Sequence, residues 1–152
     1  MLKKIEFKFA NFLVNYNENI IPPTVGTVAE IKLETDLKFI FTKYNFSAPF
    51  VNAYTTNWIE VFGKIIRLGS VIYVGNESDE TPIFAKVCEI LCLNGKYIFC
   101  CQRILNFGLN RHFYAYSISL EHEFFTLNFS HELFFKVLYI QELNNGNYVS
   151  LF

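Results

Sequence analysis

The cysteines and histidines are the side chains of this sequence that could bind a metal ion or act as nucleophiles. Cys88 and Cys92 are four positions apart on a predicted strand, which places both thiols on one face but roughly 13 Å apart. That separation is too large for one tetrahedral zinc ion, whose ligands usually flank a turn. The residues that could in principle bind zinc are Cys88, Cys92, Cys100, His112, His122 and His131. We predict no metal site and no cofactor.

Catalytic motifs are also missing. A cysteine–histidine nucleophile pair stays open as an alternative, but no helix N-terminus or cationic neighbour in the sequence would activate a thiol. There is no glycine-rich phosphate loop, no GxSxG elbow and no HExxH motif. The run Glu121-His122-Glu123 is typical of a solvated turn rather than of an acid–base site. We therefore predict a protein that is not an enzyme and has no catalytic residue.

An aromatic and basic run around residue 112 is the first candidate for a binding surface. On a strand, His112, Tyr114 and Tyr116 would share one face, opposite Phe113 and Ala115. Aromatic side chains with polar tips bury area and still donate hydrogen bonds, which suits recognition. The alternative is a half-buried sheet face beneath N-terminal helices.

Two cations on neighbouring strands extend this candidate surface. Lys86 and Arg103 are predicted to oppose each other across a hairpin. Like charges in that position are unfavourable unless they are exposed or bridged by an anion or a carboxylate. The pair would then mark a ligand-facing position. With the tryptophan included, the predicted binding residues are His112, Tyr114, Tyr116, Trp58, Lys86 and Arg103.

A central β-hairpin organises the elements that carry these residues. Asn94-Gly95 joins two apolar segments between residues 81 and 105 and suits a type I′ turn, in which both positions have φ > 0. That turn predicts the pairs Leu93–Lys96, Leu91–Ile98, Glu89–Cys100 and Val87–Gln102. Both faces of the hairpin are largely apolar, so we expect both to be covered.

The N-terminal third has helical periodicity instead. Residues 3–16 predict one helix, with a strand over residues 5–9 as the alternative, and residues 24–43 predict a second helix. From Trp58 onward, short β-branched and aromatic segments alternate with turn residues. We predict an α+β, mainly β fold, with a helical hairpin (1–46), a connector (47–57) and an antiparallel β domain (58–152) forming a small barrel or sandwich. The helices pack on that domain, or they pair between chains and give a homodimer through residues 3–44.

The amino-acid composition limits which classes of partner and which cellular compartment we expect. Of 152 residues, 52% are hydrophobic and 18% aromatic, so either a well-filled core hides this surface or a partner covers part of it. A net charge of −1 argues against the broad basic field of DNA-binding proteins. We expect neither a signal peptide nor a membrane span. The four cysteines are interpreted as reduced, buried thiols, which predicts an intracellular protein, nuclear or cytoplasmic.

Several motifs in the β-rich part resemble a known group of domains. They are the segments 82–87 (PIFAKV), 108–116 (GLNRHFYAY) and 148–151 (YVSL), preceded by Trp58 and Gly69. In this order they are similar to an uncharacterised C-terminal β domain of mobile-element-derived animal proteins. The likeness covers roughly residues 58–151, and Ala85 stands where that group usually has Gly. It implies kinship without a mechanism, because no activity is known for the group.

A more distant resemblance is to bromo-adjacent homology (BAH) domains, which are β-rich chromatin modules. Segments 69–74 (GSVIYV) and 131–135 (HELFF) are similar to their motifs, with Ser70 in place of the usual Asp. No methyl-lysine cage residue can be assigned from this likeness. We predict a non-catalytic protein-interaction module, with a chromatin-associated role of mobile-element origin as its setting. The alternatives are a β-barrel that binds a small apolar ligand, and binding of single-stranded nucleic acid through aromatic stacking.

Overall fold

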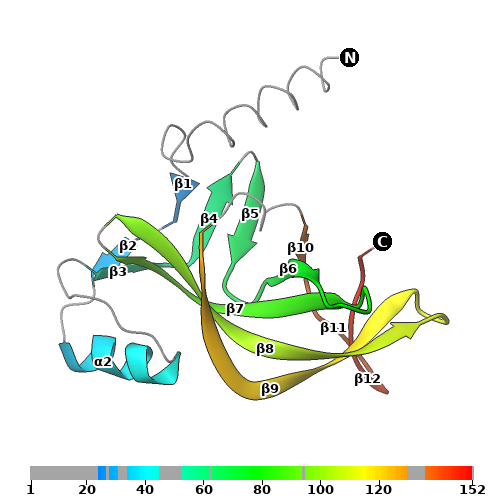
Figure 1. Cartoon of the computed structure of the whole chain (residues 1–152). Helices are drawn as coiled ribbons and strands as arrows, with labels where there is room; N and C mark the ends of the chain where they lie inside the picture. The colour runs from blue at the N-terminus through cyan, green and yellow to red at the C-terminus, as the bar shows by residue number, and fades with distance from the viewer. Residues whose placement is uncertain are drawn as a thin grey trace.

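Antiparallel strands make up nearly all of the computed structural model, which describes residues 24–26, 28–30, 34–44, 53–61, 63–93, 95–129 and 136–151. Within these ranges one helix is present, α2 (Glu34–Lys43), and it lies at one end of a strongly curved sheet (Figure 1). The prediction of an α+β fold with an N-terminal helical hairpin is therefore wrong for the part of the chain that is described.

The described strands form two antiparallel sheets. The order in the large sheet is β10 (Val137–Leu138), β6 (Val71–Asn76), β7 (Pro82–Leu93), β8 (Lys96–Asn110), β9 (Ala115–Asn128), β12 (Gly146–Val149) and β11 (Gln141–Leu143). The end of β7 that leads into the β7–β8 turn also pairs with β3 (Ala53–Thr56), which pairs with β2 (Val28–Glu30). The small sheet contains β1 (Thr24–Val25), β4 (Trp58–Val61) and β5 (Lys64–Arg67). Neither sheet closes on itself, so these strands do not form the expected barrel.

Strand pairing replaces the start of the second predicted helix. The range 24–43 contains β1 and β2 before α2 begins at residue 34. Thr24 and Val25 pair with Glu60 and Ile59 of β4, and β-branched residues such as these favour strands when a partner strand is present. The first predicted helix, residues 3–16, lies outside the described residues. The predicted connector, 47–57, contains β3, which belongs to the large sheet.

The central hairpin β7–β8 has the predicted register only near its turn. The pairs Leu93–Lys96, Leu91–Ile98 and Glu89–Cys100 are confirmed, and Gly95 has the expected positive φ of 79°. Beyond Cys88 the register shifts by one residue, because a β-bulge leaves Cys88 without a partner on β8. The pair Val87–Gln102 is therefore wrong. Because of the bulge, Val87 pairs with Cys101 and Lys86 pairs with Gln102.

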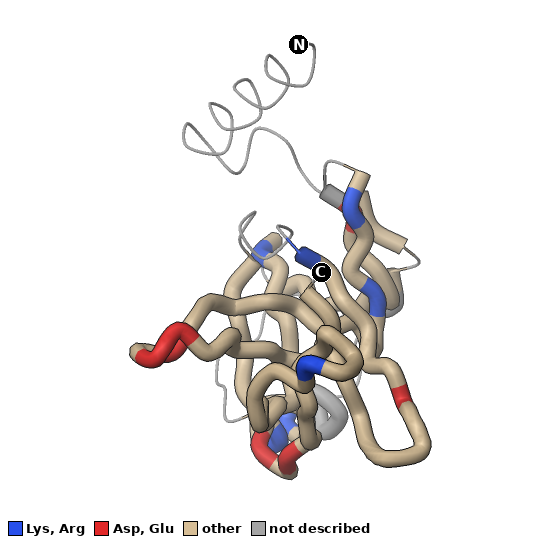
Figure 2. Tube along the Cα trace, turned by 90° about the vertical axis from the view of Figure 1, so that its right-hand side faces the viewer, with Lys and Arg blue, Asp and Glu red and all other residues tan. Residues whose placement is uncertain are grey.

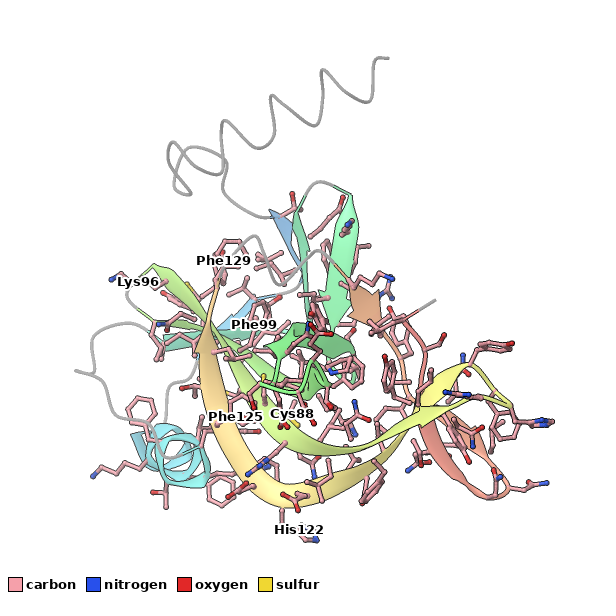
Figure 3. The ribbon with its side chains drawn as sticks, turned by 45° about the vertical axis from the view of Figure 1, so that its right-hand side comes forward. Cys88, Lys96, Phe99, His122, Phe125 and Phe129 are labelled. Carbon is pink, nitrogen blue, oxygen red and sulfur yellow. The ribbon has the colours of Figure 1, made fainter. Side chains whose placement is uncertain are left out.

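Both faces of this hairpin are covered. On one face, Ile59 and Ile66 of the small sheet pack with Val87 and Phe99 in the largest buried cluster. Figure 3 shows Phe99, Phe125 and Phe129 along the inside of the curved sheet, where Phe125 and Phe129 contact this cluster. On the other face, Tyr44 at the end of α2 packs on Leu91, Leu93 and Cys100. Strand alternation places Glu89 on the same face as Leu91 and Leu93, near Tyr44.

Candidate protein-binding surface

The far end of the β8–β9 hairpin carries the densest group of exposed apolar side chains among the described residues. This hairpin tip, residues 107–114, projects from the sheet beside β11 and β12 (Figure 1, yellow). Phe107 and Tyr114 are 67% and 69% exposed, and Leu109 and Phe113 are 43% and 39% exposed. Large apolar side chains that gather in this way are typical of an interaction site, whereas single exposed ones are ordinary.

The predicted strand face that would hold His112, Tyr114 and Tyr116 does not exist. Residues 111–114 form a turn, and β9 begins only at Ala115. His112 and Tyr114 are exposed in this turn. Tyr116 is half-buried, and its ring lies 5.7 Å from that of Phe84, edge to face. The structure therefore brings two of the three predicted residues together at the tip and places the third beside the core.

Asn110 determines the shape of this turn. Its side-chain Oδ1 accepts hydrogen bonds from the backbone N–H groups of His112 (2.9 Å) and Phe113 (3.3 Å). Asparagine is suited to this role because its short side chain mimics a backbone carbonyl in a turn. The turn ends at Tyr114, whose φ of 51° is in the left-handed region that a tyrosine rarely adopts.

Contacts with β12 and the segment after it support this strained turn. The ring of Phe113 lies 5.1 Å from that of Tyr148, edge to face, and 4.8 Å from the His112 ring. The Ser150 hydroxyl donates a hydrogen bond of 3.5 Å to the Tyr114 carbonyl oxygen. The tip is thus ordered by neighbouring residues while Phe107 and Tyr114 stay exposed.

Sequence reasoning missed Phe107 and Leu109. The segment 106–110 contains Gly108 and two asparagines, which are typical of a loop, yet it continues β8. A β-bulge lies at Phe107, where the pairing shifts between Asn106 and Gly108. The available signal was the Phe-x-Leu alternation, which is typical of a strand with one apolar face.

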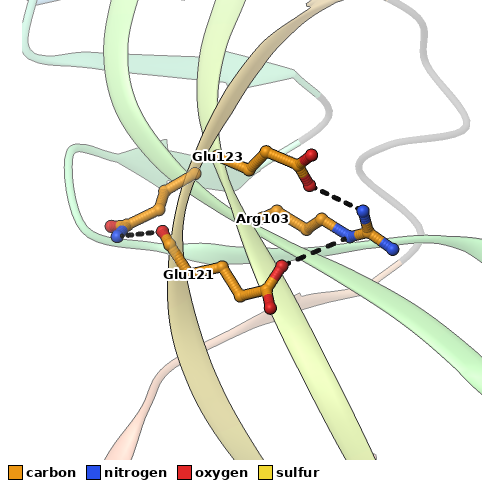
Figure 4. A network of polar contacts seen from close by, with 4 residues as sticks. Arg103, Glu121 and Glu123 are labelled. Atoms are coloured by element: carbon orange, nitrogen blue, oxygen red, sulfur yellow. Dashed lines mark hydrogen bonds and ion pairs between the residues drawn. The ribbon is translucent and has the colours of Figure 1, made fainter.

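Arg103 and Lys86 do not face each other. The bulge at Cys88 pairs Arg103 with Ala85, and Lys86 with Gln102. Instead, Arg103 donates from Nη1 to Oε2 of Glu123 at 2.6 Å, and its Nε lies 3.9 Å from Oε2 of Glu121 (Figure 4). The hydrogen bond from Arg103 to Glu123 raises the pKa of Arg103 above its usual value.

These ion pairs lie at an irregularity in β9. Gln102 pairs with Phe124 and Ile104 pairs with Leu120, so residues 121–123 of β9 lie opposite the single residue Arg103. The Gln102 side-chain amide donates to the carbonyl oxygen of Glu121 at 2.7 Å and so satisfies a carbonyl freed by this irregularity. Arg103, predicted as a binding residue, therefore has carboxylate partners within its own sheet.

Trp58 has a structural contact that its predicted binding role did not include. It lies half-buried on β4, and its carbonyl oxygen accepts a hydrogen bond of 3.0 Å from the Gly26 N–H. A Cβ atom at position 26 would lie 2.5 Å from the indole Nε1. Glycine at this position therefore lets the chain after β1 lie directly against the indole ring.

The cysteines have the chemistry of core residues. All four are free thiols, and burial raises the pKa of each, in the case of Cys100 to about 12. A thiol with a raised pKa is a poor nucleophile at neutral pH. Within the described ranges, no three His, Cys, Asp or Glu side chains are placed to hold a metal ion. Figure 3 shows His122 on the outer side of the sheet, away from Cys88, and His131 lies outside the described residues.

Comparisons of the chain with protein families, with curated proteins and with solved structures found no significant match. The resemblances to mobile-element-derived domains and to BAH domains therefore stay predictions. In the portion of the chain that is described, no helix combines the length and the apolar character needed to cross a membrane.

Proposed function

We propose that this protein is a non-catalytic protein-interaction module and that the hairpin tip, residues 107–114, is its binding surface. The observation that carries the proposal is the exposure of Phe107, Leu109, Phe113 and Tyr114 within eight consecutive residues. A projecting group of aromatic side chains matches the anchors that dominate the binding energy of protein interfaces.

Pre-organisation supports the same role. Asn110, Tyr148 and Ser150 hold the turn in one conformation, so ordering it on binding would cost little conformational entropy. The left-handed backbone of Tyr114 is less favourable for tyrosine than for glycine, and strain of this kind concentrates at functional positions. A tyrosine at this position therefore favours a role for its side chain in binding.

Charge indicates the chemistry of the partner. Arg111 and His112 are exposed within the tip, and residues 104–120 contain no aspartate or glutamate. A complementary partner would offer an apolar groove with acidic residues at its rim, since complementary charge speeds association and excludes wrong partners.

The biological setting in this proposal comes from the sequence resemblances alone. From the likeness to mobile-element-derived and BAH domains we propose a chromatin setting, and thus the nucleus, for this module. A homodimer through residues 3–44 stays a prediction only, because Thr24, Val25 and residues 28–30 of this range already pair with β4 and β3 of the same chain.

The alternative of a small apolar ligand in a barrel has less support. The described strands leave both sheets open, so they enclose no lumen. A pocket of about 820 Å³ between these strands is lined partly by Glu77, Arg103 and Glu123 and is thus not apolar throughout.

Site-specific photo-crosslinking tests the proposal. Benzoylphenylalanine at position 114 of the full chain should crosslink one defined protein in cells that naturally produce this chain. The same amino acid at position 39, where Phe39 on α2 is also 69% exposed, should not crosslink that protein. In the Phe107→Ser/Tyr114→Gly variant, capture of the same protein through an affinity tag should fall at least tenfold.

The double variant separates folding from binding. Glycine adopts φ values near 51° without strain, so Tyr114→Gly should change the free energy of unfolding by about 1 kcal/mol or less. The Phe39→Ser variant controls for the loss of an equally exposed aromatic ring. Identical crosslinks at positions 39 and 114, or capture unchanged by the double variant, would overturn the proposal.

A further inference from the structure

A second surface, separate from the hairpin tip, combines cations with an exposed aromatic ring. A pocket of about 510 Å³ lies between β5 and β10, which are neighbours at one end of the molecule. Lys64 and Arg67 of β5 line one side, and Lys136, Leu138 and Tyr139 line the other. This volume falls within the range of pockets that hold small organic ligands.

The electrostatic character of this pocket is positive. Among the described residues that line it, three side chains are cations and none is acidic, although the whole chain carries a net charge of −1. Figure 2 shows basic segments in the upper part of the molecule as well as lower down, and the most prominent acidic segments at its left-hand tip and lower edge. The strand register places one acidic residue near the pocket, Glu60, which pairs with Ile65.

Lys136 is held at the pocket wall by a contact with the segment after β12. Its side chain is half-buried, and its ammonium group donates a hydrogen bond to the backbone carbonyl oxygen of Leu151. A carbonyl accepts this hydrogen bond but carries no negative charge. The positive charge of Lys136 is therefore held at the pocket wall without neutralisation by Leu151, which favours an anion in the pocket.

We propose that this pocket binds a nucleotide unit, with its phosphate against Arg67, Lys64 and Lys136 and its base stacked on Tyr139. The Tyr139 ring is 56% exposed and lines the pocket with these cations. Cations that contact the backbone and aromatic rings that stack on bases are the two elements of single-strand recognition. The ligand is a free nucleotide or one unit of a single-stranded nucleic acid, because the pocket chemistry is the same for both.

Salt dependence gives a quantitative test with the full chain. Fluorescence anisotropy of a labelled thymidine 12-mer should give a slope of log K against log salt of about −0.7, the value for the one phosphate that the pocket would hold. Between 50 and 200 mM salt, binding should then weaken about threefold. Arg67→Gln should weaken binding at 50 mM salt and make this slope shallower.

Variants identify the pocket as the site. Tyr139→Leu should weaken oligonucleotide binding by roughly 5- to 100-fold through lost stacking and leave inorganic phosphate binding unchanged. Lys96→Gln removes an equally exposed cation at the turn between β7 and β8, far from the pocket (Figure 3), and should change nothing. Glu60→Gln should strengthen binding, because it removes the nearby negative charge.

Competition distinguishes the two sources of the ligand. If adenosine monophosphate displaces the labelled 12-mer at a concentration comparable to that of the 12-mer's nucleotide units, the ligand is a free nucleotide. If only oligonucleotides displace the 12-mer, the ligand is a single strand. Absence of binding at 50 mM salt, equal effects of Lys96→Gln and Arg67→Gln, or tighter binding of a phosphoserine peptide than of the 12-mer would overturn the proposal.

Discussion

At the scale of single residues, Gly26 and Trp58 show how one missing side chain allows two segments to meet. A Cβ atom at position 26 would lie 2.4 Å from Oδ1 of Asn57 and 2.5 Å from Nε1 of Trp58. Both distances are shorter than van der Waals contact. The adjacent strand β4 carries Ile59, which is fully buried in the main core, so the indole has little freedom to move away.

Gly26→Ala should therefore destabilise the protein by about 1–3 kcal/mol, as overpacking usually does. Urea denaturation followed by tryptophan fluorescence measures this change, because Trp58 is the single tryptophan of the chain. In a Trp58→Leu background, followed by circular dichroism, Gly26→Ala should cost clearly less. Equal costs in the two backgrounds would show that the indole is not the obstacle.

The candidate binding residues were predictable in type but not in position. His112 and Tyr114 were found because aromatic and basic residues adjoin in the sequence. Their placement in a turn depends on Asn110, whose capping hydrogen bonds compete with continued strand pairing. Arg103 was assigned to ligand binding because the bulge at Cys88, which moves it opposite Ala85, leaves no clear sequence signal.

At the scale of elements, the helix α2 is attached to the large sheet through its C-terminal end. Tyr44 is 1% exposed, and its ring lies 5.6 Å from that of Phe124, edge to face. The Lys43 ammonium lies 5.4 Å and 4.9 Å from the centroids of the Tyr44 and Phe124 rings. The Tyr44 hydroxyl lies near Glu89 but makes no hydrogen bond of normal geometry among the described residues, so the ring is the main anchor of α2.

Tyr44→Ala should lower the free energy of unfolding by about 3–5 kcal/mol, the usual effect of removing a buried aromatic ring. Tyr44→Phe keeps the ring and should change it by no more than about 1 kcal/mol in either direction. Thermal denaturation of both variants gives the comparison, with Phe39→Ala as the control on the exposed side of α2. A large loss in Tyr44→Phe would instead assign the anchoring to the hydroxyl.

Some elements could be predicted better than others because some depend on neighbouring residues and others on residues far along the chain. The turn at Asn94-Gly95 is a local signal, and the register next to it was correct. The helix predicted over residues 24–43 is present over residues 34–43 as α2 and is wrong over residues 24–30, because Val25 and Val28 fit a helical period as well as two short strands. What decides between them is pairing with β4 and β3, whose residues lie about 30 positions along the chain. Pairing with strands this far along the chain gives no signal in a short stretch of sequence.

At the scale of the whole molecule, the buried cysteines make the free energy of unfolding depend on pH. Burial raises the pKa of Cys100 from 9.0 to about 12, and it also raises those of Cys101 and Cys88. A group with a raised pKa binds more protons in the folded state than in the unfolded state between the two values. Its contribution to stability is therefore complete below pH 9 and is lost as the pH rises toward 12.

Stability should accordingly fall with increasing pH above about 9, by up to about 1.4 kcal/mol per pH unit for Cys100 alone. Burial also raises the pKa of Tyr44, so this residue adds to the decline above pH 10. Urea midpoints measured between pH 7 and 11 give the slope. Cys100→Ala removes one titrating thiol, so its stability should be lower at pH 7 and decline less steeply. All other titratable groups are the same in the wild-type chain and the Cys100→Ala variant, so the difference between their two slopes reports the Cys100 thiol. Parallel declines in stability would mean that the fold does not protect Cys100 from deprotonation.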